Sequence, residues 1–169
     1  MYSKDISKKV HSSYLLKAQK GQFTGCVAPF GYRKDPEDKN HLLIDEETAP
    51  IVRRLFAWAL EGHGPNYIRR RLEEEKIPCP TYWNRVRGLR NVSTKWEKKD
   101  PVNGRYIWDF TVIKDILMNP VYTGAIASQK KEYRFKIGTI GEKKPEEWIV
   151  VENQHEPLVD RKTFDIVQR

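Results

Sequence analysis

The chain has 169 residues, 38% of them hydrophobic, and a formal net charge of +8 at pH 7. This length predicts one domain, or one domain with an appendage, around a single modest core. No apolar run approaches about 18 residues and no secretory signal is evident, so the sequence predicts a cytoplasmic protein without a membrane span. Cys26 and Cys79 lack paired spacing and the histidines are scattered, which predicts no disulfide, metal site or cofactor.

Positive charge is concentrated in three segments of the chain. Residues 1–35, 76–107 and 108–144 carry net charges of +5, +6 and +3, whereas residues 36–75 and 145–169 are acidic. Cations that a fold gathers on one side neutralise phosphates, so this distribution favours a nucleic-acid partner. A basic protein whose lysines are simply solvated is the alternative.

The first predicted element is a helix over residues 3–20, which Gly21 ends as a C-terminal cap. Apolar side chains recur along one side of this helix, and such a stripe needs a partner. The last predicted helix, capped by Asp160 and containing Phe164 and Val167, stops after little more than two turns. Both ends therefore look cut, and we expect a fragment of a larger protein.

The middle of the chain alternates a short strand with helices. Leu42-Leu43-Ile44 predicts a strand, and acidic residues then mark a helix N-terminus. Because proline is tolerated only in a first turn, Pro50 predicts that this helix begins between residues 46 and 49; it ends at Gly62. A second helix opens at Pro65 and ends before Pro78.

Residues 79–107 carry aromatic side chains interleaved with arginine and lysine, and their pattern predicts no regular element. One interpretation is a solvated loop with one or two aromatics pinned on the core. The other is a flexible basic arm that orders against phosphates. Long loops in compact domains are usually functional or disordered, so both interpretations stay open.

A capped helix is predicted over residues 109–118. The Asp109 carboxylate can accept from the free amides of the first turn, and Pro120 forbids continuation, so the helix is expected to turn straight into a strand. Thr111, Lys114 and Asp115 lie off the apolar stripe. That stripe comprises Val112, Ile113, Ile116 and Leu117. A short helix held firmly from behind can enter a DNA major groove, although an ordinary surface helix fits the segment too.

Residues 121–151 predict a small antiparallel meander. Tyr133, Phe135 and Ile137 alternate with charged residues, and residues 148–151 form another apolar run. The predicted fold class is therefore α+β: a small helical domain with a short antiparallel β-meander, preceded by a linker helix.

Several short motifs, in register from about Gly21 to the chain end, together resemble a known family. They are Gly21-Gln22-Phe23, Ala28-Pro29-Phe30-Gly31-Tyr32, Leu43-Ile44-Asp45-Glu46-Glu47, Ile51 to Phe56, Ile68 to Leu72, Ile77-Pro78 with Pro80-Thr81, Trp108 with Asn119 to Gly124, and His155-Glu156-Pro157 with Asp160 and Phe164. This series is similar to the recombinase domain of the large serine recombinases, the integrases and transposases of phages and mobile elements.

The resemblance implies an organisation of the chain. Residues 1–20 correspond to the end of a long helix from an upstream catalytic domain, residues 21–35 to a linker loop along the minor groove, and residues 36–169 to the DNA-binding recombinase domain. In that family the catalytic serine belongs to the upstream domain, a zinc-ribbon domain typically follows, and the parent is expected to be a dimer or tetramer on DNA. The resemblance thus implies no catalytic residue in this chain, a bacterial or phage-encoded origin, and Trp108 as an anchor of helix 109–118.

Sequence-specific binding of double-stranded DNA, at attachment or transposon-end sites, is the function that the resemblance implies. The expected DNA contacts combine the linker, the basic segment, helix 109–118 and the cationic strand region. They are Lys17, Lys20, Gly21, Phe23, Phe30, Gly31, Tyr32, Arg33, Arg85, Arg87, Arg90, Lys95, Thr111, Lys114, Lys130 and Arg134.

Three alternatives come from other classes. A stand-alone metal-dependent nuclease would use Asp45, Glu46 and Glu47 with His155, although a helix dipole explains adjacent acids more simply. A non-enzymatic DNA-binding regulator would need no recombinase partner. A protein–protein scaffold would leave the basic segments unexplained.

Overall fold

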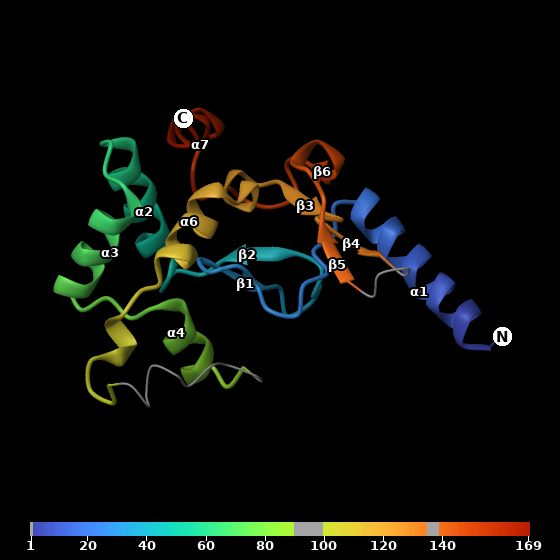
Figure 1. The fold of residues 1–169 in the computed structure, drawn as a ribbon, viewed down its shortest axis with the longest axis horizontal. Coiled ribbons are helices and arrows are strands. Elements are labelled where there is room, and N and C mark those ends of the chain that lie inside the picture. Colours follow the sequence, from blue (N-terminus) through green and yellow to red (C-terminus); the bar gives the residue numbers. More distant parts are fainter. Residues whose placement is uncertain (1, 90–99, 135–138) are drawn as a thin grey trace. The chain divides into compact units, whose positions relative to one another are not determined.

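The computed structural model describes residues 2–89, 100–134 and 139–169, which fall into two compact units (Figure 1). The first unit comprises Met1–Asp45 and Pro120–Leu158, and the second comprises Glu46–Asn119 and Val159–Arg169. Each unit is therefore made of two separate segments of the chain, which alternate along the sequence. Helices combined with short antiparallel strand pairs confirm the predicted α+β class.

Helix α1 (Tyr2–Gln19) opens the first unit and ends in a Schellman turn. The Gly21 amide donates to the carbonyl oxygen of Ala18 at 3.0 Å, and the Gln22 amide donates to that of Lys17 at 3.0 Å. Gly21 has a φ of +68°, in the left-handed region that glycine occupies without a steric penalty. The predicted helix and its cap are confirmed.

Three antiparallel strand pairs complete the first unit. They are β1 (Tyr32–Lys34) with β2 (Leu42–Ile44), β3 (Ile126–Ser128) with β6 (Ile149–Val151), and β4 (Lys131–Arg134) with β5 (Thr139–Glu142). The antiparallel pairing agrees with the prediction. The predicted meander is wrong, because β3 pairs with β6, and β4 and β5, which lie between them in the sequence, pair with each other. Gln129 follows β3 directly and has a φ of +59°, in the left-handed region.

A tight corner precedes β3. The 3₁₀ turn Pro120–Thr123 follows α6 along the chain, and Gly124 then adopts a φ of +89°. A Cβ atom on Gly124 would lie 2.8 Å from the carbonyl oxygen of His155, so the backbones approach too closely for any side chain. The prediction that helix 109–118 turns straight into a strand was therefore wrong, since this turn separates the two.

The core of the first unit is built around two tyrosines whose rings stack at 5.9 Å between centroids. The Tyr32 hydroxyl donates to the carbonyl oxygen of Glu156 at 2.9 Å, and the Tyr122 hydroxyl donates to that of Phe30 at 2.7 Å. Both hydroxyls therefore have a hydrogen-bond acceptor although their rings are buried. Burial also raises the pKa of Tyr122 above its ordinary value.

The second unit is helical. It contains α2 (Ala49–Leu60), α3 (Pro65–Glu74), α4 (Pro80–Val86), the 3₁₀ turn Gly104–Tyr106, α6 (Phe110–Met118) and α7 (Arg161–Val167). Helix α2 packs against α3, α6 and α7, and it begins within the predicted interval with Pro50 in its first turn. The buried apolar side chains of this core include Val52, Leu55, Phe56, Ile68, Leu72, Ile113 and Phe164.

Helix α4 lies in the segment whose pattern predicted no regular element. Pro80 occupies its first turn, where the missing amide costs nothing, and Cys79 stands at its N-cap without a side-chain hydrogen bond. None of its residues is fully buried, so the periodic stripe that identifies a helix is absent. The Cys79 amide donates to the carbonyl oxygen of Arg105 at 2.8 Å, which fixes the start of α4.

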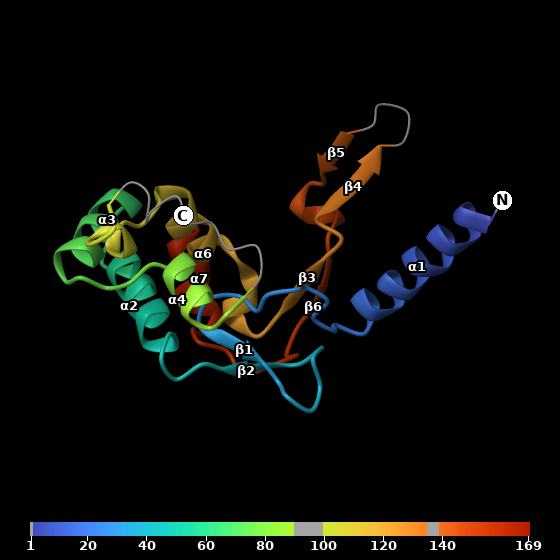
Figure 2. The same ribbon diagram turned by 90° about the horizontal axis from the view of Figure 1, so that it is seen from below.

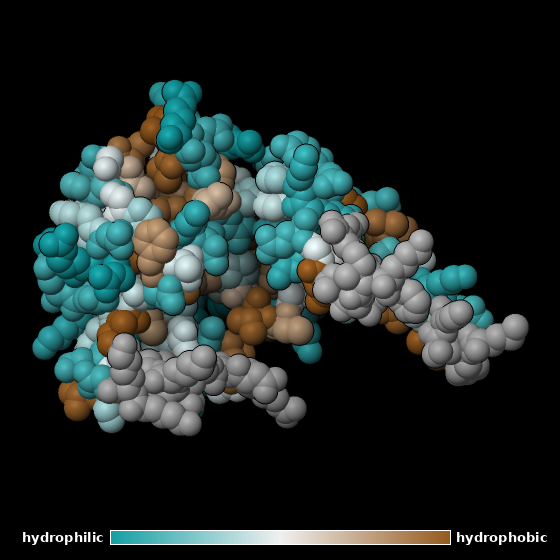
Figure 3. All heavy atoms as spheres, in the orientation of Figure 1, coloured by the Kyte–Doolittle hydropathy of each residue, from teal (hydrophilic) through white to brown (hydrophobic). Residues whose placement is uncertain are grey.

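The exterior is mainly hydrophilic on the face that Figure 3 shows, with hydrophobic atoms in scattered patches. No described helix combines the length and apolar character needed to cross a membrane. The apolar residues Ile6, Val10 and Tyr14 of α1 are each about half exposed, at 50%, 49% and 50%. The predicted apolar stripe is thus present, but it lies largely open on α1.

Candidate nucleic-acid interface

Helix α6 is fixed from behind by buried side chains. Trp108, immediately before the helix, is 1% exposed, and its indole Nε1 donates to the carbonyl oxygen of Ile77 at 2.9 Å. Ile113, Ile116 and Leu117 are buried on the inner side of α6. This arrangement confirms Trp108 as the anchor of the helix and limits its freedom to move when a ligand touches its outer side.

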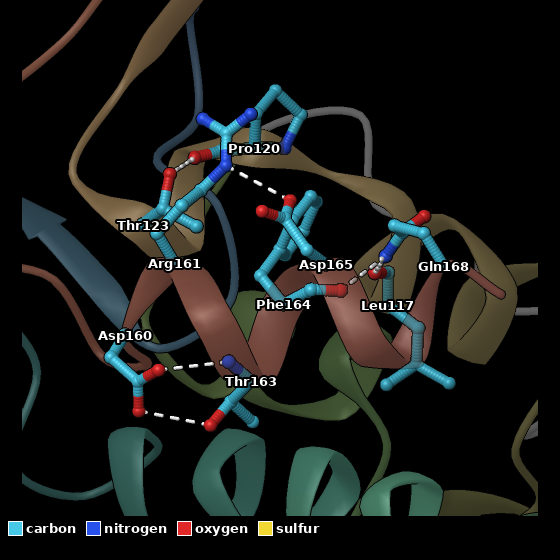
Figure 4. Close-up of polar contacts among 9 residues, drawn as sticks. All are labelled: Leu117, Pro120, Thr123, Asp160, Arg161, Thr163, Phe164, Asp165 and Gln168. Atoms are coloured by element: carbon cyan, nitrogen blue, oxygen red, sulfur yellow. Dashed lines mark hydrogen bonds and ion pairs between the residues drawn. The ribbon is translucent and has the colours of Figure 1, made fainter.

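The end of α6 is held by α7, as Figure 4 shows. The Gln168 Nε2 donates to the carbonyl oxygen of Leu117 at 2.7 Å, satisfying one of the orphan carbonyls in the last turn. Asp160 in turn caps α7, because its carboxylate accepts from the amide and the hydroxyl of Thr163 at 2.8 and 2.9 Å. A capped helix therefore supports the C-terminal end of α6.

The N-terminus of α6 is capped as predicted. Asp109 Oδ1 accepts from the Thr111 amide at 2.8 Å and from the Thr111 hydroxyl at 2.7 Å. The hydrogen bond from the Thr111 hydroxyl has the larger effect on the pKa of Asp109, and the bond from the Thr111 amide adds to it. Together they hold this pKa below its ordinary value, so the cap stays ionised at neutral pH. The hydrogen of the Thr111 hydroxyl is therefore already donated to Asp109, so this hydroxyl can only accept a further hydrogen bond.

The outer face of α6 carries the residues that the sequence placed off the apolar stripe. Thr111, Lys114 and Asp115 are all exposed. A hollow of about 400 Å³ adjoins Lys114 within the second unit. Leu60, Met118 and Ile166, each 41% exposed or more, contribute to its apolar wall. This face thus carries one ammonium group, one carboxylate and one hydroxyl, and apolar surface adjoins the ammonium group.

The arginines of the basic segment are placed differently from each other. Arg85 is exposed on α4. Arg87 forms an ion pair with Glu47 at 2.7 Å, and its guanidinium lies 5.2 Å from the centroid of the Trp83 ring. This carboxylate neutralises part of the Arg87 charge that a phosphate would otherwise meet. Arg90 and Lys95 lie outside the described residues.

The first unit contributes a second group of predicted residues. Lys20 and Arg33 are exposed, whereas Lys17 is half-buried on α1. Phe23 and Phe30 are half-buried, and the ammonium of Lys34 lies 5.6 Å from the centroid of the Phe23 ring. Lys130 stacks its ammonium on Trp148 at 4.8 Å. Arg134 ends β4, but its side chain lies outside the described part of the structure.

Three residues that the sequence predicted as DNA contacts are buried in the first unit. Tyr32 is 3% exposed and belongs to the tyrosine core, and Gly31 is buried with its carbonyl oxygen accepting from the Asp45 amide at 3.0 Å. Gly21 is buried at the end of α1. The predicted linker loop is also partly wrong, because Tyr32–Lys34 pairs with β2 as a strand. An aromatic ring with a reachable carbonyl gains more by burial than by projecting from a loop.

The residues of the nuclease alternative have structural roles. His155 is 8% exposed, and its Nε2 donates to the carbonyl oxygen of Val121 at 2.7 Å while Tyr32 meets it edge-on. Asp45 is buried, whereas Glu46 and Glu47 are exposed. Among the residues that the structure describes, no three potential metal ligands converge. Nothing in this geometry favours metal-dependent hydrolysis.

Known structures share this fold. A crystal structure of an LSR–DNA complex matches with a TM-score of 0.55 and 17% identity, covering 95% of this chain and 37% of that chain. A structure concerned with the sequence requirements of the Listeria innocua prophage attP site matches with a TM-score of 0.55 and 17% identity, covering 93% of this chain and 48% of that one. The chain therefore spans less than half the length of these two proteins.

The fold is that of a small α+β module shared with those structures. The model of the Recombinase family matches residues 46–169, which is most of the chain. This chain belongs to the Recombinase family, and the resemblance to the recombinase domain of the large serine recombinases is confirmed.

Proposed function

We propose that this chain binds double-stranded DNA in a sequence-specific manner, as the site-selecting domain of a large serine recombinase at attachment or transposon-end sites. The observation that carries the proposal is α6: a capped helix, anchored by Trp108, that presents Thr111 and Lys114 on an exposed face. A helix held in this way can lie in the major groove with its side chains against base edges. The family match and the net charge of +8 support the same conclusion.

Each side chain on α6 has a distinct proposed role. Lys114 can donate to the O6 and N7 acceptors of guanine, and the methyl group of Thr111 can pack on a thymine methyl. Because the Thr111 hydroxyl already donates to Asp109, it can only accept a hydrogen bond from DNA, for example from an exocyclic amino group. Arg85, Lys20 and Arg33 are exposed and are proposed to contact phosphates, which fix position without reading sequence.

The chemistry of recombination is proposed to belong to another part of the parent protein. In the family that the chain resembles, a serine hydroxyl attacks a phosphodiester without a metal: a phosphoserine bond forms, one phosphorus–oxygen bond to deoxyribose breaks, and that oxygen leaves as a free hydroxyl end of the strand. Ser7, Ser12 and Ser13 are exposed on α1, and the Ser12 hydroxyl donates to the carbonyl oxygen of Lys8 at 2.9 Å. This chain would therefore select the site, in the cytoplasm of a bacterial host, while a catalytic domain and a zinc-ribbon domain of the parent act beside it.

Site selection from a random duplex library, followed by binding measurements, tests the role of α6. Lys114→Ala and Thr111→Val should lower the ratio of affinities for selected and scrambled duplexes, at about 1–3 kcal/mol per lost contact. Lys162→Ala, which removes an exposed lysine from α7, is the matched control and should leave the ratio unchanged. If both α6 variants leave the ratio intact while Arg87→Ala collapses it, another element reads the sequence.

A cleavage assay separates this proposal from the nuclease alternative. Supercoiled DNA should be neither nicked nor joined by the chain, with or without Mg²⁺. Metal-dependent nicking that is lost in Asp45→Asn or His155→Ala, and also in Glu46→Gln at an exposed position of the same set, would favour the nuclease.

A further inference from the structure

A cationic hollow of about 660 Å³ lies in the first unit, between α1 and the base of the β4–β5 pair. Figure 2 shows that α1 and this strand pair diverge from a common region near β3 and β6. Lys8 and His11 line the hollow from α1, and Lys131 and Lys143 line it from the base of the strand pair. None of these four belongs to the contacts that the sequence predicted.

A second hollow, of about 430 Å³, continues the first along α1 and shares Gln129 and Lys131 with it. The α1 residues that line the two include Ser7 and His11 in one and Tyr14 and Ala18 in the other. Their spacing of four, three and four residues places them on one face of the helix. The two hollows therefore form one groove alongside α1, which we call the α1 groove.

The chemistry of the α1 groove suits a phosphodiester strand. Lys130 also lines the groove, and its ammonium lies 4.8 Å from the centroid of the Trp148 ring. Glu142 lies opposite Lys131 in the β4–β5 register but is not among the residues that line the groove. The ammonium groups of Lys8, Lys131 and Lys143 therefore meet no carboxylate among the described lining residues. Their mutual repulsion falls when an anion enters. The Gln129 amide, which lines the groove beside the lysines, can donate to phosphate oxygens, whereas the Ser12 hydroxyl already donates to the carbonyl oxygen of Lys8 at 2.9 Å.

Gln129 is placed in both hollows by an unusual backbone. Its φ of +59° lies in the left-handed region, which a residue with a Cβ atom adopts at an energetic cost. Glycine would relieve that cost, and side chains kept in such positions cluster at functional sites. The amide of Gln129 is accordingly a candidate contact in the centre of the groove.

We propose that the α1 groove binds the sugar–phosphate backbone of duplex DNA through Lys8, Lys131 and Lys143. This site is independent of the face of α6, since all of its residues belong to the first unit, and it contributes affinity without reading sequence. The inference rests on the proposed function, because it presupposes that the chain binds duplex DNA.

Fluorescence anisotropy on a random duplex, from about 0.05 to 0.3 M salt, tests the groove. The triple variant Lys8→Gln/Lys131→Gln/Lys143→Gln should reduce the slope of log affinity against log salt by about 2 to 3, and lower affinity roughly tenfold or more at about 0.1 M salt. The matched triple Lys39→Gln/Lys76→Gln/Lys162→Gln removes the same charge from exposed lysines outside the groove and should change the slope by less than one. The Lys→Arg triple at the groove positions should bind like the unaltered chain and shows that charge is the cause.

The outcomes separate the two proposals. Equal losses in the two glutamine triples overturn the groove, because net charge alone would then explain them. No duplex binding by the unaltered chain at about 0.05 M salt overturns the proposed function itself. Inorganic phosphate at constant ionic strength distinguishes a small-anion pocket: millimolar phosphate binding by the unaltered chain that is lost in the groove glutamine triple, while duplex affinity stays unchanged in that triple, would assign the groove to free phosphate and overturn the proposal.

Photo-crosslinking gives a second readout that does not depend on the lysines. In a Cys26→Ser background, an azide reagent is attached to Ser12→Cys, which lines the groove, or to Ser13→Cys, which is exposed but does not line it. Duplex DNA should crosslink at least several-fold more efficiently from position 12. Equal or reversed efficiency would place the duplex outside the α1 groove.

Discussion

Trp108 combines a large apolar ring with one polar atom that reaches a backbone carbonyl. The ring is 1% exposed and the indole donates to Ile77 at 2.9 Å. Trp108→Ala should lower the free energy of unfolding by about 3–5 kcal/mol, because it leaves a cavity behind α6. Trp108→Phe should cost less, about 1–3 kcal/mol, from the orphaned carbonyl. Urea denaturation measures both, and a loss below about 1 kcal/mol in Trp108→Ala would show that α6 does not depend on this anchor.

At Gly124 a positive φ and a close backbone approach together disfavour any side chain. Gly124→Ala should destabilise the chain by at least about 1–2 kcal/mol, since a φ of +89° is costly for alanine and the Cβ atom would lie 2.8 Å from the His155 carbonyl oxygen. Gly62→Ala is the control, because Gly62 also has a positive φ but open space around its Cβ position. Thermal melting should rank Gly124→Ala below Gly62→Ala; the opposite order would contradict the close approach.

At the scale of elements, α6 depends on its N-cap as well as on its anchor. Asp109→Ala should lower the melting temperature and weaken DNA binding together, because the Thr111 amide and hydroxyl lose their acceptor. Asp109→Ser retains a capping oxygen and should restore most of both properties. If Asp109→Ala lowers the melting temperature but leaves the specificity ratio intact, the first turn of α6 does not contact bases.

The elements that the sequence predicted well are those with a strong local signal. Helix α6 has an aspartate cap, an apolar stripe and a terminating proline, and α2 has Pro50 to fix its start. Helix α4 was missed because it buries no complete apolar face. The pairing of β3 with β6 was missed because strand order depends on contacts between residues far apart in the chain.

The candidate interface was predictable only in part for a related reason. Sequence identifies which residues are cationic, but their surroundings come from the fold. The sequence predicted Arg87 as a phosphate ligand, but the fold pairs it with Glu47. Lys8, Lys131 and Lys143 are far apart in the sequence and were not predicted, yet the fold brings them to one groove. Tyr32 likewise carries an aromatic ring of the kind that contacts DNA, yet it is enclosed in the core.

At the scale of the whole molecule, His155 couples folding to pH. Burial, opposed by its hydrogen bond to Val121, lowers the pKa of His155 below the ordinary 6.5, and nearby His41 adds a small repulsion. The unfolded chain therefore binds a proton more readily, so this contribution to stability is complete at neutral pH and is lost as pH falls below about 6.5. His155→Gln should flatten the pH dependence of the melting temperature between pH 5 and pH 7, whereas His41→Ala should leave most of it. An unchanged slope in His155→Gln would assign the effect to other groups.

Salt dependence is the most direct test of duplex binding by this chain, because a phosphate interface must release counterions when it forms. Affinity for a duplex, measured by titration across a range of salt concentrations, should fall so that log affinity against log salt has a slope of roughly −4 to −8, corresponding to about five to nine phosphate contacts. A flat response, or no binding at low salt, would contradict the assignment of this chain as a DNA-binding domain.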